Sequence, residues 1–115
     1  MPNNNYRRGA NFERRFVEWL RERGAVAARV AGSHGSFDVF AIHHGASVLC
    51  QLKSGKKPAS KEEIAALRKD ADAAGARPFI VTKKRGGKDD FFDLFYVSPS
   101  LELVADAPLT LEQPF

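Results

Sequence analysis

Apolar residues recur at three- and four-residue steps near the start of the chain, which is the spacing of an amphipathic helix. The members of this stripe are Phe12, Phe16, Val17, Trp19 and Leu20. Gly24 follows the stripe, and a glycine in that place is typical of a helix end. We therefore predict a helix that ends before Gly24, and we expect the Asn-rich residues 1–5 to be disordered.

Three strand-like runs follow this helix. Residues 25–31 are short and mostly apolar, and a Gly-Ser cluster at residues 32–36 breaks the run. Residues 37–43 and 46–53 flank His44-Gly45, whose glycine suits a two-residue hairpin turn. Both faces of these last two runs are largely apolar, so we expect them to be central strands of a sheet.

The second half of the chain predicts one more helix and two more strands. Ser60 followed by Glu63 is a capping-box signature that opens a helix through about residue 74, before Gly75. Residues 78–81 and 90–97 have the composition of strands. The order of elements is α-β-β-β-α-β-β, which predicts an α/β fold with a mixed five-stranded sheet flanked by helices.

Size and charge narrow the class of protein. A chain of 115 residues with 43% hydrophobic content suits a single domain over residues 1–115, with a tail at 99–115 to which the pattern assigns no structure. The 18 Lys and Arg residues exceed the 14 Asp and Glu residues, and this excess favours polyanionic partners such as nucleic acids.

The compartment follows from cysteine usage and from the lack of long apolar runs. Cys50 is the single cysteine and has no intrachain partner, so we expect the reducing cytoplasm, or the host cytoplasm if a virus encodes the chain. No apolar run approaches about 18 residues, and the start lacks an apolar segment, so we expect neither a membrane span nor secretion.

The candidate chemical site consists of Glu13, Asp38, Gln51 and Lys53. Hydrolysis of a phosphodiester needs oxygen ligands that converge on Mg²⁺, and a cation that orients water or stabilises developing charge. A two-residue turn at residues 44–45 would place Asp38 directly across from Gln51. Lys53 would share their face, which is otherwise apolar. A polar side chain on an apolar face costs free energy unless it has a partner or a function, so these residues are candidates for a site.

Simpler interpretations of the two acidic residues stay open. Glu13 continues the buried stripe of the first helix, one turn ahead of Phe16 and Val17. It could complement the helix dipole or pair with Arg29 instead of binding a metal. Asp38 could be an ordinary polar residue at the start of a strand.

Five blocks of residues stand in one order between Tyr6 and Ser54. They are Tyr6-Arg7-Arg8-Gly9-Ala10, Glu13, Arg29-Val30-Ala31-Gly32-Ser33, Asp38 and Leu49-Cys50-Gln51-Leu52-Lys53. Together these blocks resemble the archaeal Holliday junction resolvases, which have the restriction-endonuclease-like fold of the PD-(D/E)xK nucleases. Five blocks at family-like spacing are far more specific than any one block.

The resemblance implies a role for each matched position. Glu13, Asp38 and Gln51 would be metal-site residues, together with the backbone carbonyl of Leu52. Lys53 would be the catalytic lysine, Ser33 and Arg29 would lie beside the site, and Ser33 would belong to its catalytic residues. The residues that we assign to DNA contact, from the resemblance and from the clusters of positive charge, are Arg7, Arg8, Arg29, Ser33, His34, Lys56 and Lys57.

The sequence departs from the nuclease motif at two positions. Phe37 stands where the motif has proline, which members of the family often lack. Gln51 stands where the motif usually has glutamate. Glutamine keeps a carbonyl oxygen for a hard cation but removes one negative charge, so metal affinity should fall and Lys53 should be held less strongly. Related nucleases tolerate the QxK form, so we expect activity to survive.

The resemblance as a whole implies a Mg²⁺-dependent endodeoxyribonuclease, with Mn²⁺ as a substitute, that resolves four-way DNA junctions by paired hydrolysis. Exposed members of the group Phe91, Phe92, Phe95 and Tyr96, and the two-fold symmetry of the substrate, favour a homodimer. Two alternatives stay open: a restriction-like or repair-like endonuclease, and a non-catalytic DNA-binding module whose site has decayed through Gln51. Substrate preference tests the first, and binding without metal-dependent cleavage identifies the second.

Overall fold

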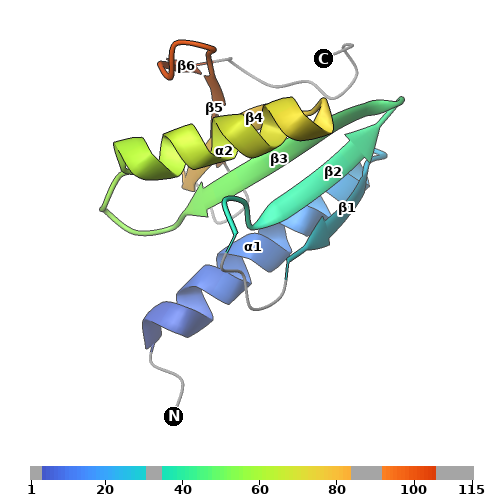
Figure 1. The fold of residues 1–115 in the computed structure, drawn as a ribbon. Helices are drawn as coiled ribbons and strands as arrows, with labels where there is room; N and C mark the ends of the chain where they lie inside the picture. Colours follow the sequence, from blue (N-terminus) through green and yellow to red (C-terminus); the bar gives the residue numbers. More distant parts are fainter. Residues whose placement is uncertain (1–3, 31–34, 84–91, 106–115) are drawn as a thin grey trace.

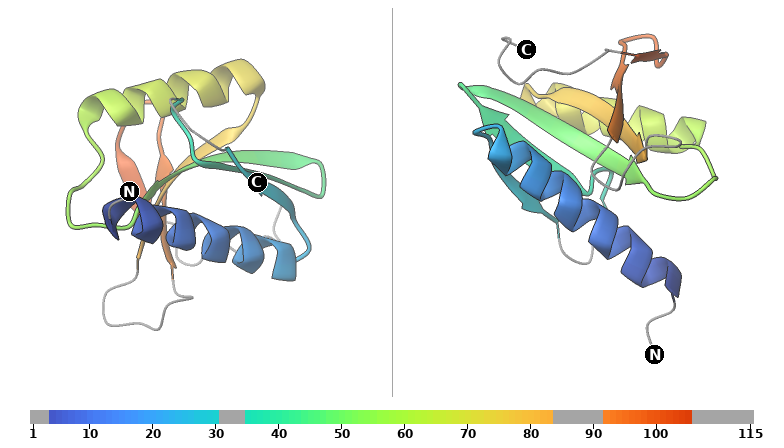
Figure 2. Two further views of the ribbon diagram at one scale, coloured as in Figure 1. Left: turned by 90° about the horizontal axis from the view of Figure 1, so that it is seen from below. Right: turned by 180° about the vertical axis from the view of Figure 1, so that it is seen from behind.

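The computed structural model describes residues 4–30, 35–83 and 92–105, with only the backbone described at residues 4–8. Its elements are α1 (Asn4–Glu22), β1 (Val26–Arg29), β2 (Val39–His43), β3 (Ala46–Lys53), α2 (Lys61–Ala74), β4 (Arg77–Lys83), β5 (Phe92–Val97) and β6 (Leu103–Ala105). The strands form one sheet in the order β1-β2-β3-β4-β5-β6. The two helices lie on opposite faces of this sheet (Figures 1 and 2). The predicted α/β class is confirmed.

The sheet is mixed, as predicted, because one of its pairs is parallel. β3 and β4 run parallel to each other, and the other neighbouring strands are antiparallel. A parallel pair cannot be joined by a tight turn and needs a crossover connection. α2 is that crossover, so it covers the face of β3 and β4 (Figure 1).

The turn between β2 and β3 fixes the register of the central hairpin. His44 has φ 50° and Gly45 has φ 78°, and a two-residue turn with both central residues at positive φ matches the twist of the flanking strands. His43 pairs with Ala46, and Val39 pairs with Cys50. The predicted hairpin and its register are confirmed over these residues.

β3 contributes alternate side chains to two separate cores. Val48, Cys50 and Leu52 face α1 and join a cluster that includes Phe12, Phe16 and Leu20. Leu49 faces α2 and joins Ile64, Leu67 and Ile80. A strand that is buried on both faces has apolar residues at nearly every position instead of at alternate ones. This explains why residues 46–53 are mostly apolar.

The capping box at the start of α2 is present as predicted. The Ser60 Oγ accepts a hydrogen bond from the Glu63 backbone N–H at 3.1 Å, and Glu63 Oε1 accepts one from the Ser60 backbone N–H at 2.9 Å. Gly75 ends the helix with φ 67°, in the left-handed region that favours glycine. The sequence therefore predicted both ends of this helix.

Several boundaries differ from the sequence prediction. α1 begins at Asn4, so Asn4 and Asn5 are helical, and the expectation of disorder at residues 1–5 is wrong for these two. β6 is a sixth strand in the tail, where the pattern predicted none. Its three residues are all exposed, so they show no apolar alternation, and backbone pairing with β5 defines the strand. β1 and β2 are shorter than predicted, and β4 is longer; β5 is described from Phe92, and the two residues predicted to precede it lie outside the described residues.

Phe92, Phe95 and Tyr96 are partly buried and pack against the two cores, so the expectation of a core contribution with some exposure holds for them. Phe92 contacts the rings of Phe12 and Phe16, with centroids 5.4 and 5.1 Å apart. Tyr96 packs against Phe79 at 5.8 Å. Phe91 lies outside the described residues, as do residues 106–115 of the tail. Within the described part of the chain, neither helix has the length and apolar character needed to cross a membrane.

Substitution of Gly45 by alanine should destabilise the fold by about 1 kcal/mol, because an L side chain is strained at positive φ. An added Cβ at this position would meet nothing within 4 Å, so the backbone angle alone is responsible. Urea denaturation measures the change. His44→Asn is the matched control, since asparagine adopts positive φ readily and should not lower the free energy of unfolding.

Candidate functional site

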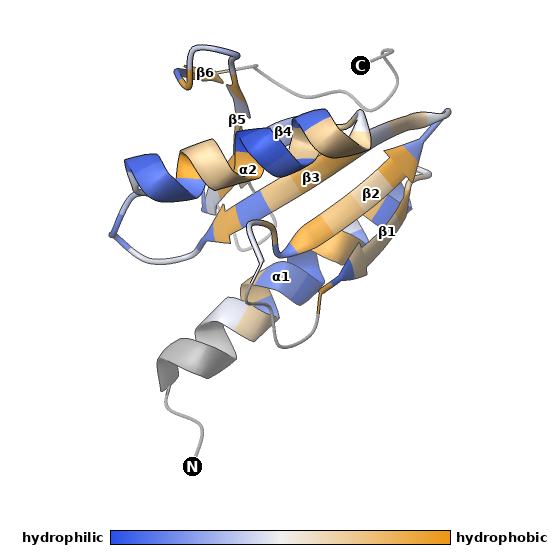
Figure 3. Cartoon of the chain, viewed as in Figure 1, coloured by the Kyte–Doolittle hydropathy of each residue, from blue (hydrophilic) through white to orange (hydrophobic). Residues whose placement is uncertain are grey.

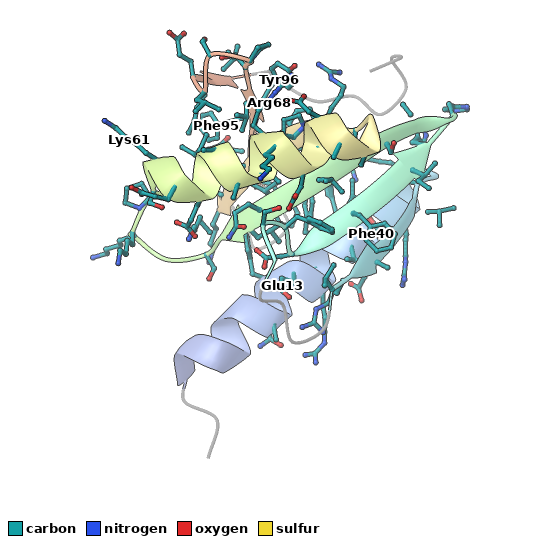
Figure 4. The ribbon with its side chains drawn as sticks, in the orientation of Figure 1. Glu13, Phe40, Lys61, Arg68, Phe95 and Tyr96 are labelled. Atoms are coloured by element: carbon teal, nitrogen blue, oxygen red, sulfur yellow. The ribbon has the colours of Figure 1, made fainter. Side chains whose placement is uncertain are left out.

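The candidate residues lie at one end of the sheet. Arg29 is the last residue of β1, Asp38 directly precedes β2, and Lys53 is the last residue of β3. Glu13 reaches this end from α1 (Figure 4). The structure therefore brings Glu13, Arg29, Asp38 and Lys53, which the sequence analysis selected, to one end of the sheet.

Asp38 lies in an irregular part of the hairpin. Its backbone N–H donates to the carbonyl of Cys50 at 2.8 Å, and Cys50 is also the partner of Val39. Two residues of one strand thus face one residue of β3, which is the arrangement of a β-bulge. Our expectation that Asp38 lies directly across from Gln51 is therefore wrong. A bulge redirects a side chain, and the Asp38 carboxylate accepts a hydrogen bond from the Leu52 backbone N–H at 2.9 Å.

Burial affects both acidic residues of the site. Burial raises the pKa of Asp38, and the Leu52 N–H and the charge of Lys53 oppose this effect only in part. Burial also raises the pKa of Glu13, and the neighbouring charge of Asp38 adds to the rise. Two partly buried carboxylates with raised pKa values, of which Glu13 also responds to the charge of Asp38, would gain from a bound cation.

Glu13 has a cationic partner in the protein. Arg29 Nε lies 3.1 Å from Glu13 Oε1, and the two side chains are 27% and 19% exposed. This is the simpler interpretation that the sequence left open for Glu13. The contact does not exclude a metal role, because a carboxylate oxygen accepts more than one interaction, and because the second oxygen is not used in this ion pair.

Lys53 is held by a residue that the sequence analysis did not select. Its Nζ lies 2.6 Å from Glu63 Oε2 in the first turn of α2. The pKa of Glu63 is lowered, first by this hydrogen bond and then by the one from the Ser60 backbone. Glu63 was assigned only to the capping box. The signal that could have revealed more is its place in the helix that crosses back over the end of β3.

The other possible metal ligands of the site are amide and carbonyl oxygens, which carry no negative charge. Gln51 is partly buried at the end of β3, next to Leu52. Among the described residues, no three Asp, Glu, His or Cys side chains gather closely enough to form a metal-binding group. Mg²⁺ commonly takes only one or two carboxylates and keeps several waters, so this arrangement still suits that ion.

Basic side chains surround this end of the sheet. Lys56 and Lys57 are exposed in the loop that follows β3. A small cleft of about 140 Å³ lies nearby and is lined by Asn11, Phe12, Arg15, Ser54 and Lys83. Ser54 directly follows Lys53, so the cleft adjoins the candidate site on its positively charged side.

Some of the predicted residues cannot be placed in the site. Ser33 and His34 lie outside the described residues. Arg7 and Arg8 belong to α1, but their side chains are not among those described. The roles assigned to these residues stay predictions.

Comparisons with known proteins identify a family and agree with the fold. The family model of the archaeal Holliday junction resolvases (Hjc) matches residues 4–106. Among solved structures, the chain is similar to Hjc, a Holliday junction resolvase from the archaeal hyperthermophile Archaeoglobus fulgidus. The TM-score is 0.63 at 22% sequence identity, and the match covers 84% of this chain and 94% of that one. No curated protein matches this sequence significantly.

Substitution of Asp38 by asparagine should stabilise the fold at neutral pH. The raised pKa of Asp38 means that its ionised form is less favourable in the folded than in the unfolded state. Stability therefore increases as the pH falls and Asp38 takes up its proton. The melting temperature of Asp38→Asn should exceed that of the wild type by a few degrees at pH 7, and the gap should close toward pH 3.8, the ordinary value for this carboxyl.

The matched control for this measurement is Asp38→Ala. Asparagine keeps an oxygen for the Leu52 N–H, whereas alanine leaves that partly buried N–H without its acceptor, at a cost of about 1–3 kcal/mol. Thermal unfolding followed by circular dichroism between pH 7 and pH 4 compares the three proteins. A lower melting temperature for Asp38→Asn at pH 7 would contradict the assignment of burial as the dominant effect.

Proposed function

This chain belongs to the archaeal Holliday junction resolvase family and is a junction-resolving nuclease, and we propose that it hydrolyses two opposed phosphodiesters with the residues at the end of β3. The observation that carries this proposal is the joint placement of Asp38, the Leu52 backbone and Lys53 at that end. Nucleases of this family are metal-dependent in general. The ion, the ligands, the oligomeric state and the residue roles belong to the proposal.

Asp38, the amide oxygen of Gln51 and the carbonyl of Leu52 would hold Mg²⁺, with Glu13 as a second carboxylate beside them. Mn²⁺ would substitute, since it accepts the same oxygen donors. The bound ion would polarise the scissile phosphate and lower the pKa of a coordinated water. The raised pKa values of Asp38 and Glu13 support this assignment, because a cation removes the cost of two nearby carboxylates.

Lys53 would act on the phosphate or on the attacking water. An ammonium group supplies three donors and a full positive charge, so it can orient the water or stabilise the charge that develops in the transition state. Arg29 would position Glu13 through the ion pair between them. Arg29 would then act next to the metal site as well as next to the DNA.

The DNA backbone would follow the basic side chains around the site. Lys56, Lys57, Arg15 and Lys83 lie at this end of the sheet, and positive charges near phosphates release counterions and strengthen binding. Arg7, Arg8, Ser33 and His34 would extend this track. Contacts to the backbone suit a substrate that is recognised by the shape of the junction, in the cytoplasm of the cell or of a virus's host.

The homodimer would form through the open face of β1 and β2. Val26, Phe40 and Ile42 are 71%, 38% and 48% exposed, and Val26 is the direct neighbour of Ile42 in the sheet. α2 covers β3 and β4 on this face but does not extend over β2, whose surface is hydrophobic (Figure 3). A second copy related by two-fold symmetry would cover this apolar surface and present a second site to the junction.

A labelled four-way junction should be nicked symmetrically in the presence of Mg²⁺, whereas a linear duplex of matched sequence should not. EDTA should abolish the cleavage, and Asp38→Ala should reduce it by at least about 100-fold, on the scale of other single losses of electrostatic stabilisation. Denaturing gels of both labelled strands measure the nicks. Tight junction binding without any Mg²⁺-dependent nick would reject the proposal and indicate a decayed site.

Ile42→Lys should convert the dimer to a monomer, because a lysine cannot be buried in an apolar interface without a partner. Val104→Lys is the matched control, since Val104 is 44% exposed on β6, at the other edge of the sheet. Light scattering after size exclusion gives the mass of each protein. Loss of the dimer in Val104→Lys, or its persistence in Ile42→Lys, would place the interface elsewhere.

A further inference from the structure

The contact between Lys53 and Glu63 joins the end of β3 to the start of α2. Lys53 Nζ and Glu63 Oε2 are 2.6 Å apart, a short charge-assisted hydrogen bond. The side chains are 22% and 37% exposed, so solvent has only partial access to the pair. The end of a flexible lysine is thereby fixed at the candidate site.

Glu63 is itself held in place by its other oxygen. Oε1 accepts the Ser60 backbone N–H at 2.9 Å, and the Glu63 N–H donates back to the Ser60 hydroxyl at 3.1 Å. The capping box therefore sets the direction of the carboxylate and leaves Oε2 for Lys53. A side chain that is anchored in this way positions its partner at little further cost in side-chain entropy.

The neighbouring residue that would ordinarily balance the lysine has no charge. Gln51 stands two positions before Lys53 on the same strand, and its amide is neutral. The charge of Lys53 lowers the pKa of Asp38, but the hydrogen bond described for the Asp38 carboxylate is the one from the Leu52 N–H. Among the described side chains, Glu63 forms the one carboxylate ion pair recorded for Lys53.

We propose that Glu63 is a positioning residue of the nuclease site, which holds Lys53 for catalysis and supplies the negative charge that Gln51 lacks. The catalytic role of Lys53 rests on the proposed function, and the rest of the proposal rests on the contact between Lys53 and Glu63. It makes α2 part of the active site. It also explains how the QxK form of the motif keeps its lysine in place.

Glu63→Gln tests the proposal with little risk to the fold. Glutamine at this position of a capping box still accepts the Ser60 N–H, so the variant removes the charge and keeps the cap. Glu62→Gln is the matched control, because Glu62 is the neighbouring acidic residue of the same helical turn and is exposed. Both variants should melt within a few degrees of the wild type.

The first readout uses the metal-free protein and does not depend on activity. In NMR spectra, the ε-CH₂ protons of a lysine that is held in one conformation differ in chemical shift, whereas those of a mobile lysine coincide. The two Lys53 signals should be separate in the wild type and in Glu62→Gln. They should coincide in Glu63→Gln, as those of the exposed Lys56 do.

The second readout is the single-turnover cleavage of a four-way junction. Glu63→Gln should slow cleavage by about 10- to 100-fold, since small misplacements of a catalytic group have effects of this size. Junction affinity, measured in EDTA, should not change. Introduction of Gln51→Glu into Glu63→Gln should restore most of the rate, because a carboxylate then again lies beside Lys53.

Three results would overturn the proposal: unchanged Lys53 signals in Glu63→Gln, a cleavage rate equal to or above that of the wild type, or no rescue by Gln51→Glu. Failure of the proposed function looks different. In that case the wild type itself cleaves no junction, and the NMR comparison still decides whether Glu63 holds Lys53.

Discussion

The burial of β3 on both faces requires a layer of side chains on each side of the sheet, and α1 and α2 provide these layers. The apolar residues of the strand pack in these two layers. Its polar residues lie outside the fully buried stretch of residues 48–50, and Gln51 and Lys53 fall in the last three positions of the strand. The position of the site is in this sense a consequence of how the sheet is covered.

Charges at the edge of a core are costly unless each has a partner, and here the partners come from different elements. Arg29 of β1 meets Glu13 of α1, the Leu52 N–H of β3 meets Asp38, and Glu63 of α2 meets Lys53. The partial burial of Asp38 remains unfavourable to its ionised form. Such an arrangement lowers the free energy of unfolding, as functional sites commonly do in the folds that contain them.

Much of the architecture was predictable because local signals agree with the tertiary structure. The stripe from Phe12 to Leu20, the turn at His44 and Gly45, and the Ser60–Glu63 cap each have a short-range pattern. β6 was not predictable, because its strand is defined by hydrogen bonds to β5 and not by its side chains.

The residues of the candidate site were proposed from the sequence, and part of their arrangement was not predictable from it. Resemblance selected Glu13, Asp38, Gln51 and Lys53, and alternation along a strand placed the last two on one face. The bulge at Asp38 shifts the register by one residue, and no pattern in the sequence reveals it. Glu63 was missed because its capping signature already explained its presence, and a contact between residues ten positions apart depends on the path of the chain.

The two oxygens of Glu63 hold both ends of the segment that connects β3 to α2, since one binds Lys53 and the other binds Ser60. Residues 54–59 form the surface loop between these two contacts. The positions where the loop leaves β3 and enters α2 are therefore fixed by Lys53 and Ser60 and do not depend on the residues within the loop. Loops of this kind accept insertions and changes of sequence at small cost to the fold. The length and charge of this loop can therefore change while Lys53 and α2 keep their relative positions.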